Sequence, residues 1–211
     1  WDESLEKYFL EEFRILSVLP ANSNPKKFIA TDFQIPKEEL FVEIIPDSGI
    51  NWIASFQPGC SEFSAIYPHP NKIDLIVISK GQGYVINPEN QELLEKFGGN
   101  ITSKIEEIDK YLKQDLPTKR IESPVILFVN NSSLIFYDYQ GFIWQNTDIS
   151  WNNIRKIKIY GRSVIVGEFF SNEESWMPFW LNIKTGEFHR EEFSNERFFG
   201  QNTKRPWWQF W

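Results

Sequence analysis

The chain has 211 residues, of which 41% are hydrophobic and 17% aromatic, and it carries a formal net charge of −7 with a pI near 5.0. This length and apolar content predict a single domain, residues 1–211, with a sizeable core. The acidic balance argues against nucleic acid as a partner, because a protein that binds phosphate backbones needs clustered lysine and arginine.

Cysteine and histidine are scarce, which limits the chemistry of the chain. One cysteine, Cys60, cannot form an internal disulfide, and the two histidines, His69 and His189, are not part of a Cys/His cluster that would support zinc. We therefore expect no metal and no other cofactor. The lone thiol predicts a cytoplasmic location, and the lack of a run of about 18 apolar residues predicts no integral membrane segment.

The first segment, residues 1–19, has the periodicity of an amphipathic helix. Its apolar side chains recur at steps of three and four residues, and Pro20 follows the segment. The residues on this stripe are Leu5, Tyr8, Phe9, Phe13 and Leu16. We expect an N-terminal helix that packs across a sheet.

From Phe28 onward the pattern changes to short β-rich runs separated by turn residues, which predicts a mainly β core over residues 41–191. The expected strands are 41–45, 52–56, 64–67, 75–79, 83–87, 125–130, 134–138, 142–145, 154–160, 163–170, 177–183 and 187–191.

Three stretches share one plan: strand, turn, strand, a turn that begins with Asn or Asp, and strand. They cover residues 75–94, 125–144 and 164–189, and their second turns begin at Asn87, Asp138 and Asn182. The interval of roughly 45–50 residues is close to one propeller blade, which predicts blade-like antiparallel meanders. A closed propeller usually needs at least four blades. The sheets are therefore expected to be propeller-like, with further strands from residues 41–67, or to pack as a sandwich.

One segment, residues 101–116, departs from this β pattern. Ser103 and Glu106 have the spacing of a capping box, and Pro117 follows the segment. One face of the segment would carry Ile101, Ile105, Ile108 and Leu112. We expect one helix here, inserted between the first and second units.

Several stretches together resemble a group of bacterial proteins with no assigned activity. They are GQGYVIN at 81–87, LIFYDYQGFIW at 134–144, ISWNNI at 149–154 and WMPFWLNIKTG at 176–186. The resemblance covers about the second two thirds of the chain. It implies a bacterial source and implies no catalytic activity.

The candidate binding residues are tryptophans, of which the chain has nine. Exposed indoles stack on sugars and anchor protein interfaces. The candidates are Trp144, Trp151, Trp176, Trp207, Trp208 and Trp211. The last three belong to the aromatic C-terminal tail, residues 192–211, which is expected to dock either on the domain's own sheet or in a groove of a partner.

These observations favour a non-enzymatic protein that binds another macromolecule, most simply another protein, in an accessory or immunity-type role. The first alternative is a module that binds a small ligand or carbohydrate through exposed tryptophans. The second is a hydrolase-like enzyme that uses Cys60 as a nucleophile with His69 as its base, and it requires the two side chains to meet.

Overall fold

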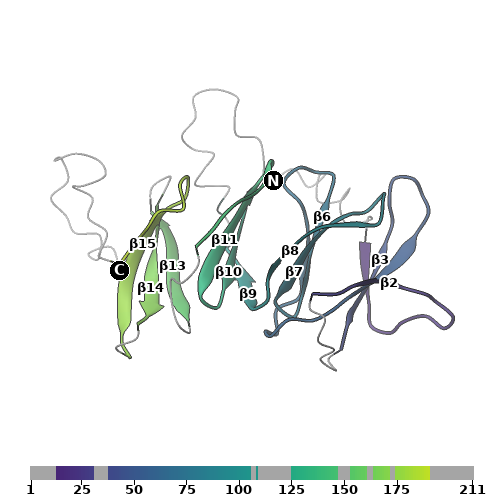
Figure 1. The fold of residues 1–211 in the computed structure, drawn as a ribbon, viewed down its shortest axis with the longest axis horizontal. Helices are drawn as coiled ribbons and strands as arrows, with labels where there is room; N and C mark the ends of the chain where they lie inside the picture. The colour runs from purple at the N-terminus through teal and green to yellow at the C-terminus, as the bar shows by residue number, and fades with distance from the viewer. Residues whose placement is uncertain are drawn as a thin grey trace.

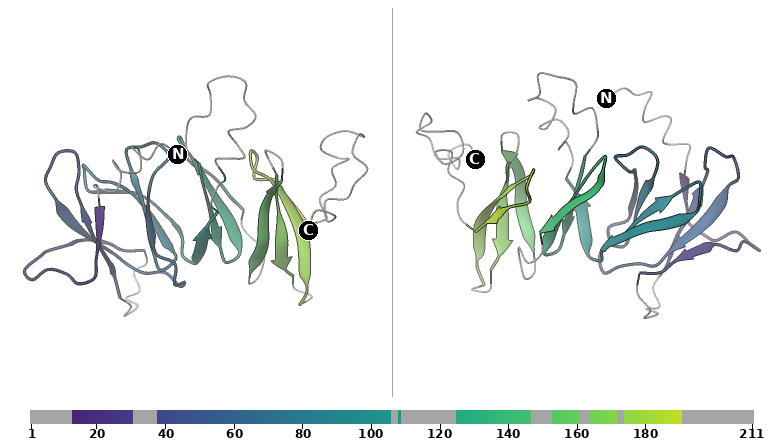
Figure 2. Two further views of the ribbon diagram at one scale, coloured as in Figure 1. Left: turned by 180° about the vertical axis from the view of Figure 1, so that it is seen from behind. Right: turned by 45° about the horizontal axis from the view of Figure 1, so that its top comes forward.

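Four sheets of four strands make up the part of the chain that is described in the computed structural model, namely residues 13–30, 38–105, 108, 125–146, 153–160, 164–171 and 174–190. Figure 1 shows the sheets side by side in a row that follows the order of the chain. The first and fourth sheets lie at opposite ends of that row, as the two further views in Figure 2 also show. The fold is therefore mainly β, as the sequence predicts, and a closed propeller is not seen.

The first sheet has mixed connectivity, with the strand order β1-β3-β4-β2. β3 pairs antiparallel with both β1 and β4, whereas β2 pairs parallel with β4. The strands are β1 (Phe13–Leu16), β2 (Lys26–Phe28), β3 (Leu40–Ile44) and β4 (Trp52–Phe56).

The other three sheets are consecutive antiparallel meanders. The second consists of β5 (Ala65–Pro68), β6 (Leu75–Ser79), β7 (Gln82–Asn87) and β8 (Glu92–Gly98). The third consists of β9 (Ile101–Lys104), β10 (Ile126–Asn130), β11 (Ser133–Asp138) and β12 (Gly141–Asn146). The fourth consists of β13 (Ile154–Tyr160), β14 (Val164–Phe170), β15 (Trp176–Asn182) and β16 (Phe188–His189).

The three units predicted from the sequence are the last three strands of these three meanders. In each unit the Asn or Asp that begins the second turn accepts a backbone hydrogen bond on its side-chain oxygen. Asn87 accepts from the N–H of Asn90 at 2.9 Å, Asp138 from Gln140 at 2.7 Å and Asn182 from Lys184 at 2.9 Å. Such Asx turns explain why these residue types recur there.

The core consists of apolar layers between successive sheets. The layer between the first and second sheets includes Val42, Phe56 and Tyr84, and that between the second and third includes Ile78, Phe128 and Tyr137. The layer between the third and fourth includes Leu127, Phe136, Ile165, Phe179 and Leu181. Both faces of the second and third sheets are thus packed, which is why β6 and β10 are buried along their whole length.

Two glycines make room for phenylalanine rings on neighbouring strands. Gly83 of β7 pairs with Phe97 of β8, and a Cβ atom at Gly83 would lie 2.4 Å from the Phe97 ring. Gly167 of β14 pairs with Phe179 of β15, and a Cβ atom there would lie 2.7 Å from that ring. In both sheets the phenylalanine ring covers the backbone of the glycine that pairs with it on the neighbouring strand.

The two expected helices are not confirmed. Phe13–Leu16 is strand β1, so the N-terminal prediction is wrong there, and residues 1–12 lie outside the described part. Ile101–Lys104 is strand β9, so the second helix does not begin at residue 101. Apart from Ile105 and Ile108, the rest of that segment also lies outside the description. In both places β-sheet pairing with β3 or β10 overrides the helical spacing of the apolar residues.

High pH is expected to destabilise the fold through two buried tyrosines. Burial raises the pKa of Tyr84 and Tyr137 well above the usual value of 10, and neighbouring carboxylates raise it further. Below pH 10 the two tyrosines stay protonated in both the folded and the unfolded protein. Above it the unfolded tyrosines lose protons that the folded ones keep, so the free energy of unfolding should fall by up to about 1.4 kcal/mol per pH unit for each residue. Urea unfolding between pH 9 and 11 measures this slope.

The control for this effect is removal of the phenol groups. Tyr84→Phe and Tyr137→Phe should each reduce the slope, and the double variant should lose most of it. A free energy of unfolding that does not change across this range would contradict the expectation.

Candidate functional site

The outer face of the fourth sheet is the strongest candidate for a binding surface. Phe169, Phe179 and Leu181 point toward the third sheet, because they belong to the core layer between the two sheets. Side chains alternate along a strand, so their neighbours point the other way. That outer face carries Tyr160, Val164, Val166, Glu168, Phe170, Trp176, Trp180 and His189.

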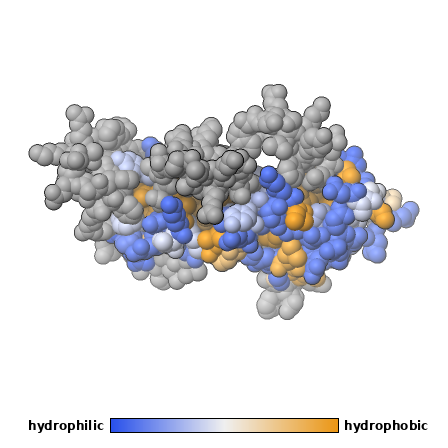
Figure 3. Space-filling view, turned by 90° about the horizontal axis from the view of Figure 1, so that it is seen from above, coloured by the Kyte–Doolittle hydropathy of each residue, from blue (hydrophilic) through white to orange (hydrophobic). Residues whose placement is uncertain are grey.

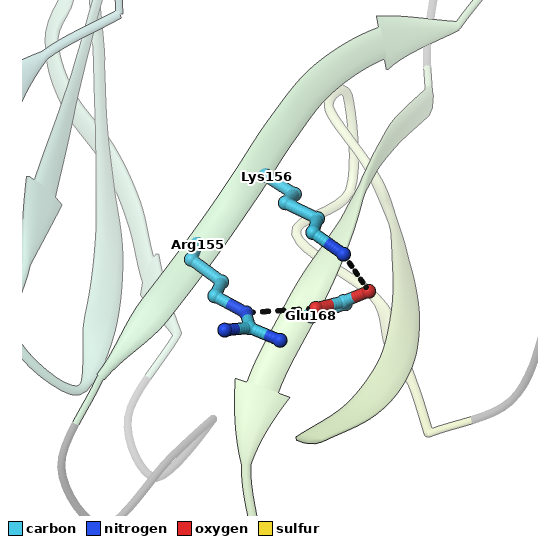
Figure 4. A network of polar contacts seen from close by, with 3 residues as sticks. All are labelled: Arg155, Lys156 and Glu168. Carbon is cyan, nitrogen blue, oxygen red and sulfur yellow. Dashed lines mark hydrogen bonds and ion pairs between the residues drawn. The ribbon is translucent and has the colours of Figure 1, made fainter. Parts of the chain in front are cut away.

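At one end of this face Arg155 is held between a carboxylate and an indole. Its Nε donates to Glu168 Oε2 at 2.8 Å, and its guanidinium lies 3.7 Å from the centre of the Trp176 ring. Lys156 Nζ donates to the other oxygen of Glu168 at 2.8 Å, as Figure 4 shows. We call Arg155, Lys156, Glu168 and Trp176 the Arg155 patch.

A β-bulge explains why two consecutive residues of β13 reach the same carboxylate. The register of β13 against β14 shifts between Arg155 and Lys158, and Lys156 has a φ of 52°. A bulge lets neighbouring side chains leave the normal alternation. Both cations therefore lie on the outer face beside Glu168.

The charges of the patch do not cancel. Partial burial alone would raise the pKa of Glu168, but the hydrogen bonds from Lys156 and Arg155 outweigh it and hold that pKa below its usual value. The carboxylate stays ionised at neutral pH beside two cations, which leaves a net positive charge. Within the described residues, the two terminal nitrogens of Arg155 have no hydrogen-bond acceptor, and the side chain is 44% exposed.

The other end of the face is buried and apolar. Val164, Val166 and Trp180 form a cluster with exposed fractions of 0%, 3% and 7%, and Tyr160 packs against it. His189 stacks on Trp180 with 3.7 Å between ring centres and 11° between planes. This end is continuous with the Arg155 patch through Glu168, which lies two residues beyond Val166 on β14.

The structure places only one of the predicted tryptophans on this face. Trp176 is half-buried within the Arg155 patch. Trp144 lies elsewhere, on β12 of the third sheet. Trp151, Trp207, Trp208 and Trp211 lie outside the described residues.

Trp144 links the third and fourth sheets. Its ring stacks on Phe136 at 5.3 Å, its Nε1 donates to the carbonyl of Ile183 at 2.7 Å, and Gly186 packs directly against it. Trp52 makes the equivalent link from the first sheet to the second, with its Nε1 donating to the carbonyl of Pro88 at 2.9 Å. Trp144 therefore has a structural role in the described part of the chain.

Cys60 and His69 do not come together. The N–H of Gly59 donates to Ser79 at one end of β6, whereas the N–H of His69 donates to Asp74 at the other end. Five strand residues separate these points by roughly 15 Å. Cys60 is exposed, and His69 is buried with its ring against Tyr137. Burial lowers the pKa of His69, although Asn71, Asp74 and nearby carboxylates act against that shift.

The described ranges contain no group of three or more His, Cys, Asp or Glu residues placed to hold a metal ion. They also contain no helix long and apolar enough to cross a membrane. In the view of Figure 3, hydrophobic atoms outside the grey regions occur in small separate groups among hydrophilic ones.

Of the four residues of the candidate patch, the sequence predicted Trp176 as a binding residue and did not predict Arg155, Lys156 and Glu168. The available signal was weak: residues 154–160 carry three cations, Arg155, Lys156 and Lys158, and the next expected strand has a single acidic residue, Glu168. The bulge that brings Arg155 and Lys156 together has no recognisable sequence signature.

Comparison with protein-family models and with curated proteins found no match to this chain.

Proposed function

We propose that the protein is a non-enzymatic binding protein that uses the Arg155 patch to contact another protein. The observation that carries the proposal is the Arg155 side chain, which is held through its Nε and the Trp176 ring and is still 44% exposed. A planar guanidinium donates two parallel hydrogen bonds to a carboxylate. The partner that fits is a protein surface with an aspartate or glutamate side chain next to apolar residues.

Preorganisation supports this choice. A free arginine side chain loses about 2 kcal/mol of rotamer entropy when it is fixed in an interface. Here Glu168 and the Trp176 ring already hold Arg155, so much of that cost is met before a partner arrives. Arginine and tryptophan are also the residue types most often found at interface hot spots.

The carbohydrate alternative receives less support from the same geometry. Sugar stacking needs an accessible ring face. Arg155 covers one face of Trp176, while Phe136 and Gly186 pack against Trp144. The alternative enzyme with Cys60 and His69 lacks contact between its two members. The cytoplasmic location remains a prediction from the lone cysteine.

Binding of a model acidic ligand tests the proposal. The probe is a capped, dye-labelled peptide of glutamate and leucine, measured by fluorescence anisotropy against its glutamine–leucine counterpart. We expect only the acidic peptide to bind, and we expect Arg155→Ala to weaken it about tenfold or more, because a charge-assisted hydrogen bond contributes about 1.5–3 kcal/mol. Arg155→Lys should also weaken binding, because it keeps the charge and loses the paired donors.

The matched control is Arg14→Ala. Arg14 also pairs with a glutamate, Glu43, but on the first sheet, and its side chain is 70% exposed. This variant should bind the peptide like the parent. Equal losses in the Arg14 and Arg155 variants, or full binding by Arg155→Lys, would defeat the proposal. Binding of a neutral oligosaccharide that is lost in Trp176→Ala would favour the carbohydrate alternative.

A further inference from the structure

The apolar end of the fourth sheet's outer face is more buried than its position at the end of the row explains. No further sheet of the described part packs on this face. Yet Val164 and Val166 are only 0% and 3% exposed, and Trp180 is 7% exposed. Of the described side chains, Tyr160 packs against this cluster and His189 stacks on Trp180.

The first sheet, at the other end of the row, shows how exposed the outer apolar side chains of a terminal sheet can be. The outer face of the first sheet carries Leu16, Phe41 and Ile53, because their neighbours Val42 and Ala54 belong to the inner core layer. All three are only partly buried. The outer apolar side chains of the first sheet are thus partly in water, whereas Val164, Val166 and Trp180 on the fourth sheet are not.

We propose that the C-terminal segment of this same chain, residues 191–211, is the ligand of the Val164–Val166–Trp180 cluster. The chain leaves the sheet from its edge strand β16, whose His189 stacks on Trp180 at this face, and Arg190 is the last described residue. The segment that follows contains seven large aromatic residues: Phe193, Phe198, Phe199, Trp207, Trp208, Phe210 and Trp211.

Composition and length favour this intramolecular ligand over a separate partner. An attached segment of about 20 residues has a high effective concentration at a face that adjoins its own origin. Its apolar rings match a cluster of two valines and an indole.

Truncation and a double-mutant cycle test the proposal. Deleting residues 206–211 should lower the melting temperature by roughly 4–8 °C, because several large aromatic side chains lose their burial. If the segment contacts Trp180, the same deletion in a Trp180→Ala background should have a clearly smaller effect, since the two changes remove the same contact.

The matched background is Val42→Ala, a core variant in the layer between the first and second sheets. There the deletion should keep its full effect. An unchanged melting temperature on deletion would overturn the proposal, and so would equal effects of the deletion in the Trp180→Ala and Val42→Ala backgrounds.

A synthetic peptide of residues 191–211, added to the truncated protein, gives a second readout that does not depend on folding of a core variant. It should raise the melting temperature of the truncated chain, whereas a peptide whose seven aromatic residues are replaced by alanine should leave that temperature unchanged. The failure of this proposal leaves the Arg155 patch untouched, because the acidic-peptide assay reports on the other end of the face.

Discussion

Replacing Gly83 by valine is expected to lower the free energy of unfolding by about 3 kcal/mol, at the upper end of the cost of overpacking a core. A Cβ atom at this position would lie 2.4 Å from the Phe97 ring, and Phe97 is itself buried at 7% exposure. The ring would have to leave the layer between the second and third sheets. Chemical denaturation measures the loss, and thermal melting should show it as a fall of roughly 6–12 °C.

A smaller neighbour should relieve this collision. In a Phe97→Leu background, Gly83→Ala should cost clearly less than it does in the parent, because leucine leaves room for the added methyl group. Gly49→Ala is the control for loss of a glycine as such, since Gly49 has open space around it and a φ of 78°. It should cost about 1–2 kcal/mol, from the left-handed backbone alone. A stable Gly83→Val protein would refute the packing argument.

Trp144→Ala is expected to destabilise the protein by about 3 kcal/mol, the lower end of the range for a tryptophan in a core, because this side chain is only half-buried. The substitution removes the stacking on Phe136, the contact with Gly186 and the hydrogen bond to Ile183 in the fourth sheet. Urea denaturation of the variant measures the change.

Trp144→Phe separates the two contributions. It keeps an aromatic ring against Phe136 and loses the indole N–H, so it should cost about 1 kcal/mol. Trp52→Phe should cost a similar amount, because Trp52 makes the equivalent hydrogen bond to Pro88. If Trp144→Ala and Trp144→Phe are equally destabilised, packing of the ring contributes little and the explanation is wrong.

The β part of the fold was predictable because its signals are local. The expected strands at 52–56, 75–79 and 154–160 have the observed bounds, and the turn residues Asn87, Asp138 and Asn182 make the expected turns. Turn chemistry and short β-branched runs act within a few residues, so a single sequence contains them.

The errors occurred where distant partners decide the structure. Phe13 and Leu16 have helical spacing, yet β1 forms because β3, about 30 residues away, pairs with it. The Arg155 patch depends on a bulge in β13 and on the neighbouring strands β14 and β15. The pairing register of these strands therefore decides which residues make up the Arg155 patch. The spacing of residues along the sequence does not reveal that register.

The arrangement of the sheets in a row bears on whether such a chain can gain or lose a whole sheet. Each of the last three sheets is one continuous stretch of chain, and its strands pair only within that stretch. Apolar contact passes from one sheet to the next through separate layers. As in solenoid repeats, stability is then close to a sum of unit and nearest-neighbour contributions. Duplication or loss of one such stretch would lengthen or shorten the row without requiring the remaining sheets to change their strand order.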